Sequence, residues 1–241
     1  MIHGNSIDLC DRCLKSKFAA LQSALLFPGG VDRRRLSAVF RDEYFSMTSV
    51  AALMLASRTY AMLGNETLWK VAQNCHQVLD EAEIPHAIVG GVAVCLHGYQ
   101  RNTVDVDLLV RRADGERLRE VLEQAGFKWI ASEAEFRSES GVPVQLLMAG
   151  ERAGKGSEIR LPDPDSAKCV TIKEGLPVLS LARLIETKLA CGSGSLRRTH
   201  KDFADVVELI VANRLGSGFA RFLHKTVRET FRNLVTRTRE S

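Results

Sequence analysis

Two aspartates interrupt an otherwise apolar run near the middle of the chain, and this feature constrains the fold most. The segment Thr103–Val110 reads TVDVDLLV, whose continuously apolar end is typical of a buried strand. Because side chains alternate along a strand, Asp105 and Asp107 would point to the same face, about 7 Å apart at Cα. Like charges on a core strand are unfavourable unless a cation offsets them. The run therefore predicts a site for one or two divalent metal ions.

A glycine pair stands upstream of these acids. Gly90-Gly91 follows the apolar segment His86–Val89, which predicts a strand, and precedes Val92–His97, which predicts a short helix. Glycines at such a junction allow close backbone approach and leave the N–H groups of the next helix free to meet phosphate oxygens. Hard oxygen ligands favour Mg²⁺ or Mn²⁺, and two such ions suit in-line phosphoryl transfer. We therefore expect phosphate and metal to bind at one place.

Neither element is specific alone, since D-x-D pairs are common at strand ends and turns often need glycine. Their combination is stronger: an apolar residue, Gly-Gly, 13 intervening residues and then Asp-Val-Asp-Leu. Just before the acids, Arg101 could pair with a phosphate, and Thr103 could bond a phosphate or support the acids. No G-x-G-x-x-G follows the first strand and no G-x-x-x-x-G-K-[ST] occurs, which argues against a Rossmann dinucleotide site and a P-loop.

Size and composition set broad limits. The 241 residues suffice for one good-sized domain, alone or with an appendage, and a net charge of +4 is too small to indicate nucleic-acid binding by itself. No stretch of 18 apolar residues occurs, so we expect no membrane span. The six cysteines form no disulfide framework, and Cys10-x-x-Cys13 has no second ligand pair for zinc. A cytoplasmic protein is the simplest expectation.

The order of predicted elements indicates an α+β fold with helices gathered at the C-terminus. We expect an N-terminal extension at residues 1–61, poorly ordered or with a mis-assigned start, then a core at 62–175 and a C-terminal helical region at 176–241. After the first strand and helix, the predicted strands are Thr103–Val110, Lys128–Ala131, Glu135–Ser138 and Val142–Met148. The predicted later helices are Glu116–Ala125, Val178–Ala190, Asp202–Ala212 and 219–236.

From about Met62 to Arg232 the chain resembles the polymerase-β-like nucleotidyltransferases, and most of all their AbiEii-type branch, which includes toxin–antitoxin and abortive-infection proteins. The matching pieces are IPHAIVGGVAVCLHGYQRNTVDVDLLV, GVPVQLLMAGE, LPVLSLARLIETKLACG and KDFADVVELI. The resemblance implies the nucleotidyltransferase fold, a small mixed β-sheet with flanking helices, followed by C-terminal helices. It also implies that Asp105 and Asp107 bind metal and that Gly90 and Gly91 form the phosphate-facing turn.

The same resemblance adds residues from the later helices. Lys188 would reach the triphosphate, Asp202 would be a further active-site acid, and Asp205 is the weaker candidate for that role. Two plainer interpretations stay open: Lys188 is a solvated helix residue, and Asp202 is an acid that the dipole favours at a helix N-terminus.

One departure from the family pattern concerns a third carboxylate, which many members carry on a later strand. Gln145 stands at the corresponding position in VPVQLL. Glutamine cannot act as a base and is a poorer, neutral metal ligand. Turnover is therefore more in question than nucleotide binding, with Glu139 and Asp202 as candidates to substitute for the missing acid.

Three functions follow from these observations. The first is an enzyme that binds a nucleoside triphosphate with Mg²⁺ or Mn²⁺ and transfers a nucleoside monophosphate to a hydroxyl of a protein, an RNA such as tRNA, or a small molecule. The second is a catalytically weak or inactive module of the same fold, for example a toxin–antitoxin component with a cognate antitoxin. The third is nucleic-acid binding through the basic residues of 213–241.

Overall fold

A seven-stranded mixed sheet forms the core of the chain, of which the computed structural model describes residues 66–240. The predicted extension at 1–61 and the Cys10-x-x-Cys13 pair lie outside the described residues. The strands run in the order β3-β4-β5-β2-β1-β7-β6. Their bounds are β1 (His86–Val89), β2 (Val106–Val110), β3 (Lys128–Ile130), β4 (Glu135–Arg137), β5 (Pro143–Met148), β6 (Val170–Lys173) and β7 (Leu176–Leu179).

The central strands are buried and combine both pairing directions. β1 pairs antiparallel with β2, whereas β2 pairs parallel with β5 and β1 pairs parallel with β7. All four residues of β1 are buried, as are Val106 and Leu108–Val110 of β2. A strand that is covered on both faces reads as a nearly continuous apolar run, which explains the sequence of both strands. The predicted α+β class with a mixed sheet is confirmed.

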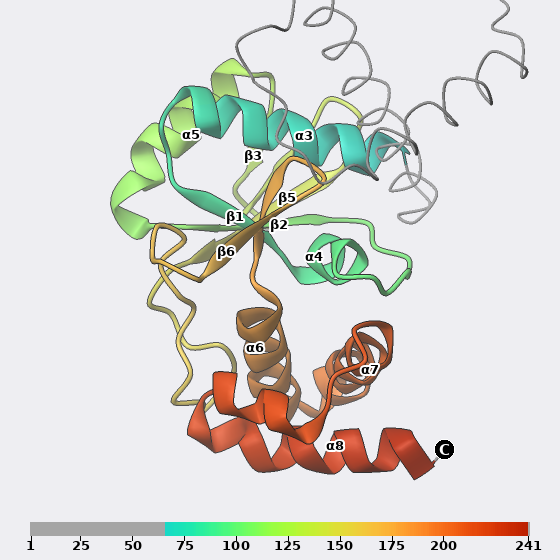
Figure 1. Ribbon diagram of the computed structural model, residues 1–241. Coiled ribbons are helices and arrows are strands. Elements are labelled where there is room, and N and C mark those ends of the chain that lie inside the picture. Colours follow the sequence, from blue (N-terminus) through green and yellow to red (C-terminus); the bar gives the residue numbers. More distant parts are fainter. Residues whose placement is uncertain (1–65, 241) are drawn as a thin grey trace, which may run out of the picture. The chain divides into compact units, whose positions relative to one another are not determined.

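Helices cover both faces of this sheet (Figure 1). In Figure 1, α3 (Glu66–Glu81) and α5 (Gly115–Gln124) lie above the sheet, and α4 (Gly90–Leu96) lies below it. The C-terminal helices come next on the α4 side, and α6 and α7 pack closely against each other. The remaining elements are α6 (Leu181–Gly194), α7 (Leu196–Ala212), α8 (Arg228–Glu240) and the short 3-10 helices η1 (Arg112–Asp114), η2 (Ser217–Phe222) and η3 (Lys225–Val227).

α3 shows why these segments are helical. Leu68, Ala72, Cys75 and Leu79 recur three or four residues apart, and each is fully buried. This spacing places them on one stripe, which packs on the sheet while polar residues face outward. None of the described helices has the length and apolar character needed to cross a bilayer.

The hairpin of β6 and β7 is the main element that sequence patterns missed. Val178 lies in β7, where it pairs with Ile88, so the predicted helix start at Val178 is wrong. The helix begins at Leu181 instead, with Ser180 at its N-cap position. Glu174 and Gly175 turn the chain between the strands with φ of 49° and 78°, and positive φ at both positions is the mark of a type I′ hairpin turn. Residues 176–179 therefore belong to the sheet.

Candidate active site

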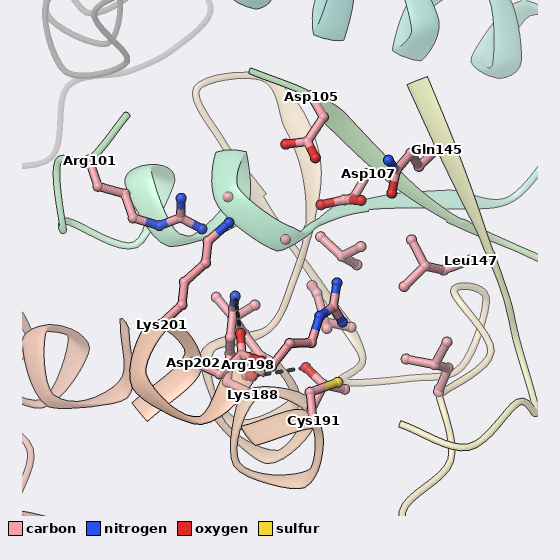
Figure 2. A pocket seen from close by; sticks show the side chains of 17 residues that line it. Arg101, Asp105, Asp107, Gln145, Leu147, Lys188, Cys191, Arg198, Lys201 and Asp202 are labelled. Atoms are coloured by element: carbon pink, nitrogen blue, oxygen red, sulfur yellow. Dashed lines mark hydrogen bonds and ion pairs between the residues drawn. The ribbon is translucent and has the colours of Figure 1, made fainter. Parts of the chain in front are cut away.

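An open pocket lies between the sheet and the C-terminal helices, where the start of α4 faces α6 and α7 (Figure 2). Eight residues were singled out from the sequence for this site, and seven of them line the pocket. These seven are Gly90, Gly91, Arg101, Asp105, Asp107, Lys188 and Asp202. The eighth, Thr103, is buried beside the pocket.

Asp105 and Asp107 form the negative wall of the pocket. Asp105 lies one residue before β2 and Asp107 lies within it, and both side chains point into the pocket (Figure 2). Thr103 Oγ1 donates a hydrogen bond to Asp105 Oδ1 at 3.0 Å. Neither aspartate forms an ion pair with any described residue, so their charges are not offset by direct contact with a cationic side chain.

The pKa of Asp107 reflects this environment. Burial, and after it the charge of Asp105, raises the pKa of Asp107 from 3.8 to about 6. Both causes disfavour the charged form of the carboxyl group. Lys188, Arg198 and Lys201 act in the opposite direction, without cancelling the rise. A divalent cation between the two carboxylates would remove the repulsion, so this pair fits a metal ion.

The glycine pair is required by the acid-bearing segment itself. A Cβ atom at Gly90 would stand 1.7 Å from Asp107 Oδ2, and Gly90 has a φ of 61°. A Cβ atom at Gly91 would stand 2.2 Å from Thr103 Oγ1. No side chain fits at either position without displacing those groups. The backbone at Gly90-Gly91 is therefore closely approached, as expected, and the groups that approach it are the side chains of Asp107 and Thr103.

The opposite wall rests on a buried network of charges. Lys188 Nζ lies 2.8 Å from Asp202 Oδ1 and 2.7 Å from Asp205 Oδ2. Arg101 Nε lies 2.8 Å from Asp205 Oδ1, so this guanidinium is engaged by an acid although it lines the pocket. Lys188 is 8% exposed and Asp202 is 5% exposed, in the interior of α7. The plainer interpretations, a solvated lysine and an acid at a helix N-terminus, do not describe these residues.

Two cations of the pocket were not singled out from the sequence. Arg198 and Lys201 are exposed residues of α7 that line the pocket, and neither pairs with an acid among residues 66–240. They reach from α7 toward the side that holds Asp105 and Asp107 (Figure 2). Residues three apart lie on one face of a helix. The sequence predicts a helix that begins only at Asp202, so it does not indicate that Arg198 and Lys201 share a helix face.

Gln145 occupies the place next to the acid pair. It lies opposite Asp107 in the parallel pairing of β2 and β5, and it lines the pocket. Glu139, one of the two acids proposed to substitute for a third carboxylate, does not line it. In the described part of the chain, no three His, Cys, Asp or Glu side chains gather closely enough to hold a metal ion. Among the described residues, the pocket carboxylates without an ion-pair partner are Asp105 and Asp107, since Asp202 is paired with Lys188.

Among known proteins, the chain is similar to several solved structures. No family model matches the chain, and no curated protein matches it. A Thermotoga maritima protein named as a nucleotidyltransferase, TM1012, is 16% identical over 56% of this chain and 91% of its own, with a TM-score of 0.43. ANT(2'')-Ia in complex with adenylyl-2''-tobramycin is 16% identical over 71% of this chain and 98% of its own, with a TM-score of 0.45. At these values, function has to be inferred from the pocket itself.

Replacing Asp107 with asparagine is expected to stabilise the metal-free protein at neutral pH. The folded-state pKa of about 6 lies above the ordinary 3.8, so ionised Asp107 destabilises the fold increasingly as pH rises from 4 to 7. At about 1.4 kcal/mol per pH unit, the gain for Asp107→Asn is at most about 3 kcal/mol. Thermal unfolding in EDTA at pH 7.5 should show a raised Tm, with little change at pH 4. The exposed Asp80→Asn serves as control, and a lowered Tm at pH 7.5 contradicts the account.

Removing the charge of Lys188 is expected to destabilise the fold strongly. Lys188→Met leaves two buried carboxylates, Asp202 and Asp205, without their shared cation. Breaking a buried ion pair from one side costs about 3–5 kcal/mol. Urea unfolding measures the loss, and the exposed Lys128→Met is the matched control. Equal stability of the two variants would show that Lys188 is not held in this network.

Proposed function

We propose that this protein is a nucleotidyltransferase of the polymerase-β-like type, which binds a nucleoside triphosphate with Mg²⁺ or Mn²⁺. One observation carries the proposal: Asp105 and Asp107 face Arg198 and Lys201 across one pocket, and none of the four forms an ion pair within residues 66–240. A metal–triphosphate complex has the complementary charges, with cations for the acids and phosphate oxygens for the basic side chains.

Different residues of the pocket would bind the metal and the phosphates. Asp105 and Asp107 would hold the metal, which supplies charge neutralisation at the phosphate that is attacked. Arg198 and Lys201 would bind phosphate oxygens, while Lys188 is held by two acids and shapes the base of the pocket. In the transfer, the acceptor hydroxyl would lose its proton to solvent as its oxygen bonds to the α-phosphorus, the bond from the α-phosphorus to the bridging oxygen breaks, and pyrophosphate leaves. Catalysis then rests on alignment and electrostatic stabilisation.

The pocket also has an apolar wall, to which Leu147, Leu161 and Leu184 contribute. Apolar side chains beside a few converging polar groups are typical of sites for small organic ligands. This wall is therefore the proposed place for the nucleoside. The charged walls would hold the phosphates and the metal.

The finer assignments come from the resemblance in sequence. They are membership of the AbiEii-type branch, a cognate antitoxin, and a hydroxyl acceptor on a protein, tRNA or small molecule, whereas the cytoplasmic location is proposed from the cysteine pattern. Exposed basic residues on the C-terminal helices, among them Arg221, Lys225 and Arg232, support an RNA acceptor, because such side chains can bind a phosphate backbone. Gln145, in place of a third carboxylate, favours the second candidate function, a nucleotide-binding module with weak or absent turnover.

Nucleotide binding should depend on both walls of the pocket. Calorimetry with each nucleoside triphosphate and Mn²⁺ should show binding by the wild type and none by Asp107→Asn. Arg198→Gln and Lys201→Gln should each lose at least about tenfold in affinity, since a hydrogen bond to a charged group contributes about 1.5–3 kcal/mol. Arg197→Gln is the matched control, because Arg197 is an exposed neighbour on α7 that does not line the pocket.

Transfer of label from α-³²P-labelled triphosphate separates the two candidates. Metal-dependent transfer with release of pyrophosphate supports the enzyme, and tight binding without pyrophosphate release supports the inactive module. Absence of nucleotide binding in the wild type, or equal binding by Asp107→Asn, contradicts both.

A further inference from the structure

Three polar side chains form a row across neighbouring strands beside the pocket. Asp107 of β2 lies opposite Gln145 of β5, and Gln145 lies opposite Glu135 of β4. Residues that oppose each other in paired strands share a face of the sheet. The row therefore leads from the metal-facing acid, through a carboxamide, to a second acid farther from the pocket. Glu135 is the nearest acid beyond Gln145 in this row, and the sequence did not suggest it for the site.

Glu135 is a buried and partly neutralised acid. It is 6% exposed, and Arg137 Nη2 lies 2.8 Å from its Oε1. Its other oxygen, Oε2, accepts a hydrogen bond from Gln145 Nε2 at 3.4 Å. Glu135 does not line the pocket, whereas Gln145 does. Glu135 therefore contacts a pocket residue without itself reaching the ligand space.

This contact decides which end of the Gln145 carboxamide faces the pocket. Gln145 donates this hydrogen bond through Nε2, so the NH₂ end of its carboxamide faces Glu135. Its carbonyl oxygen is then left for the other side, where the carboxamide lies beside Asp107 (Figure 2). A carbonyl oxygen is a suitable, though neutral, ligand for hard cations.

We propose that Glu135 is a positioning residue that holds the Gln145 carbonyl oxygen toward the metal-facing side of the pocket. Gln145 then supplies a neutral third oxygen ligand beside Asp105 and Asp107. This inference rests on the proposed function, since it concerns the same metal site. The position of Glu135 also limits its repulsion of Asp107: Glu135 lies on β4, separated from β2 by β5, and Arg137 offsets its charge.

The arrangement predicts that Gln145 and Glu135 are coupled. A carboxylate introduced by Gln145→Glu alone would face Glu135, and like charges directly opposite in a sheet are destabilising. The exchange variant Gln145→Glu/Glu135→Gln removes this conflict. It places an acid at the pocket and an amide behind it, with the hydrogen bond between the two strands retained.

Binding of Mn²⁺ alone, measured by electron paramagnetic resonance, tests the proposal without depending on turnover. Glu135→Leu should weaken Mn²⁺ binding about tenfold or more, as loss of an outer partner of a ligand usually does. Glu135→Gln should stay close to the wild type, because its amide oxygen still accepts from Gln145. The exchange variant should bind about tenfold more tightly than the wild type, since it adds a charged ligand. Gln145→Glu alone should gain less than the exchange variant.

Glu139→Leu is the control, since Glu139 is an exposed acid that does not line the pocket and has no hydrogen bond or ion pair with Glu135 or Gln145 among the described residues. It should bind Mn²⁺ like the wild type. Wild-type affinity in folded Glu135→Leu, or an exchange variant no tighter than the wild type, overturns the positioning role while leaving the proposed function intact. A wild type that binds no Mn²⁺ overturns both. Thermal unfolding of each variant identifies any that fail to fold. If Glu135→Leu does not fold, the Mn²⁺ affinities of the exchange variant and Glu135→Gln decide whether Glu135 is a positioning residue.

Discussion

The repulsion between two half-buried carboxylates is the interaction on which this account of the pocket rests. Asp105 and Asp107 lie on one wall with no ion-pair partner in the described part of the chain, and burial, followed by the charge of Asp105, raises the pKa of Asp107 to about 6. Such a pair is unfavourable in the absence of a ligand, and the loss has to be offset elsewhere in the fold. The buried apolar residues of β1 and β2, the strands beside this wall, contribute stability that offsets it. A site that opposes stability in the free protein is the usual sign of a binding function.

On the opposite wall of the pocket, buried charges are paired with one another. Lys188 and Arg101 are paired with Asp202 and Asp205, and these contacts tie α6, α7 and the segment before β2 together. The network is nearly neutral and buried, so it fixes the spacing of the two helices without adding a net field. The free positive charge comes instead from exposed side chains on the same face of α7. The pocket thus separates the groups that hold its shape from those proposed to bind phosphate.

Local sequence patterns predicted the part of the site that is local in the chain. Gly90-Gly91 and the acid pair lie within 18 residues, and glycine is dictated there by the approach of Asp107 and Thr103. The partner of Arg101 stands 104 residues away, and the contact of Gln145 with Glu135 depends on strand register, so neither could be derived from spacing. The β6–β7 hairpin was missed because a short buried apolar run suits a strand or a helix equally well. The resemblance, not periodicity, directed attention to Lys188 and Asp202.

Measuring the pKa of Asp107 is the most direct test of the central claim that Asp105 and Asp107 bind a cation. Carbon NMR of protein labelled at the aspartate carboxyl groups can follow its titration, with Asp107→Asn used to assign the signal. The account predicts a pKa of about 6 without metal, and a clear fall when Mg²⁺ and a nucleoside triphosphate are added together. A value close to the ordinary 3.8 in the metal-free protein, unchanged by Mg²⁺ and nucleotide, would contradict it.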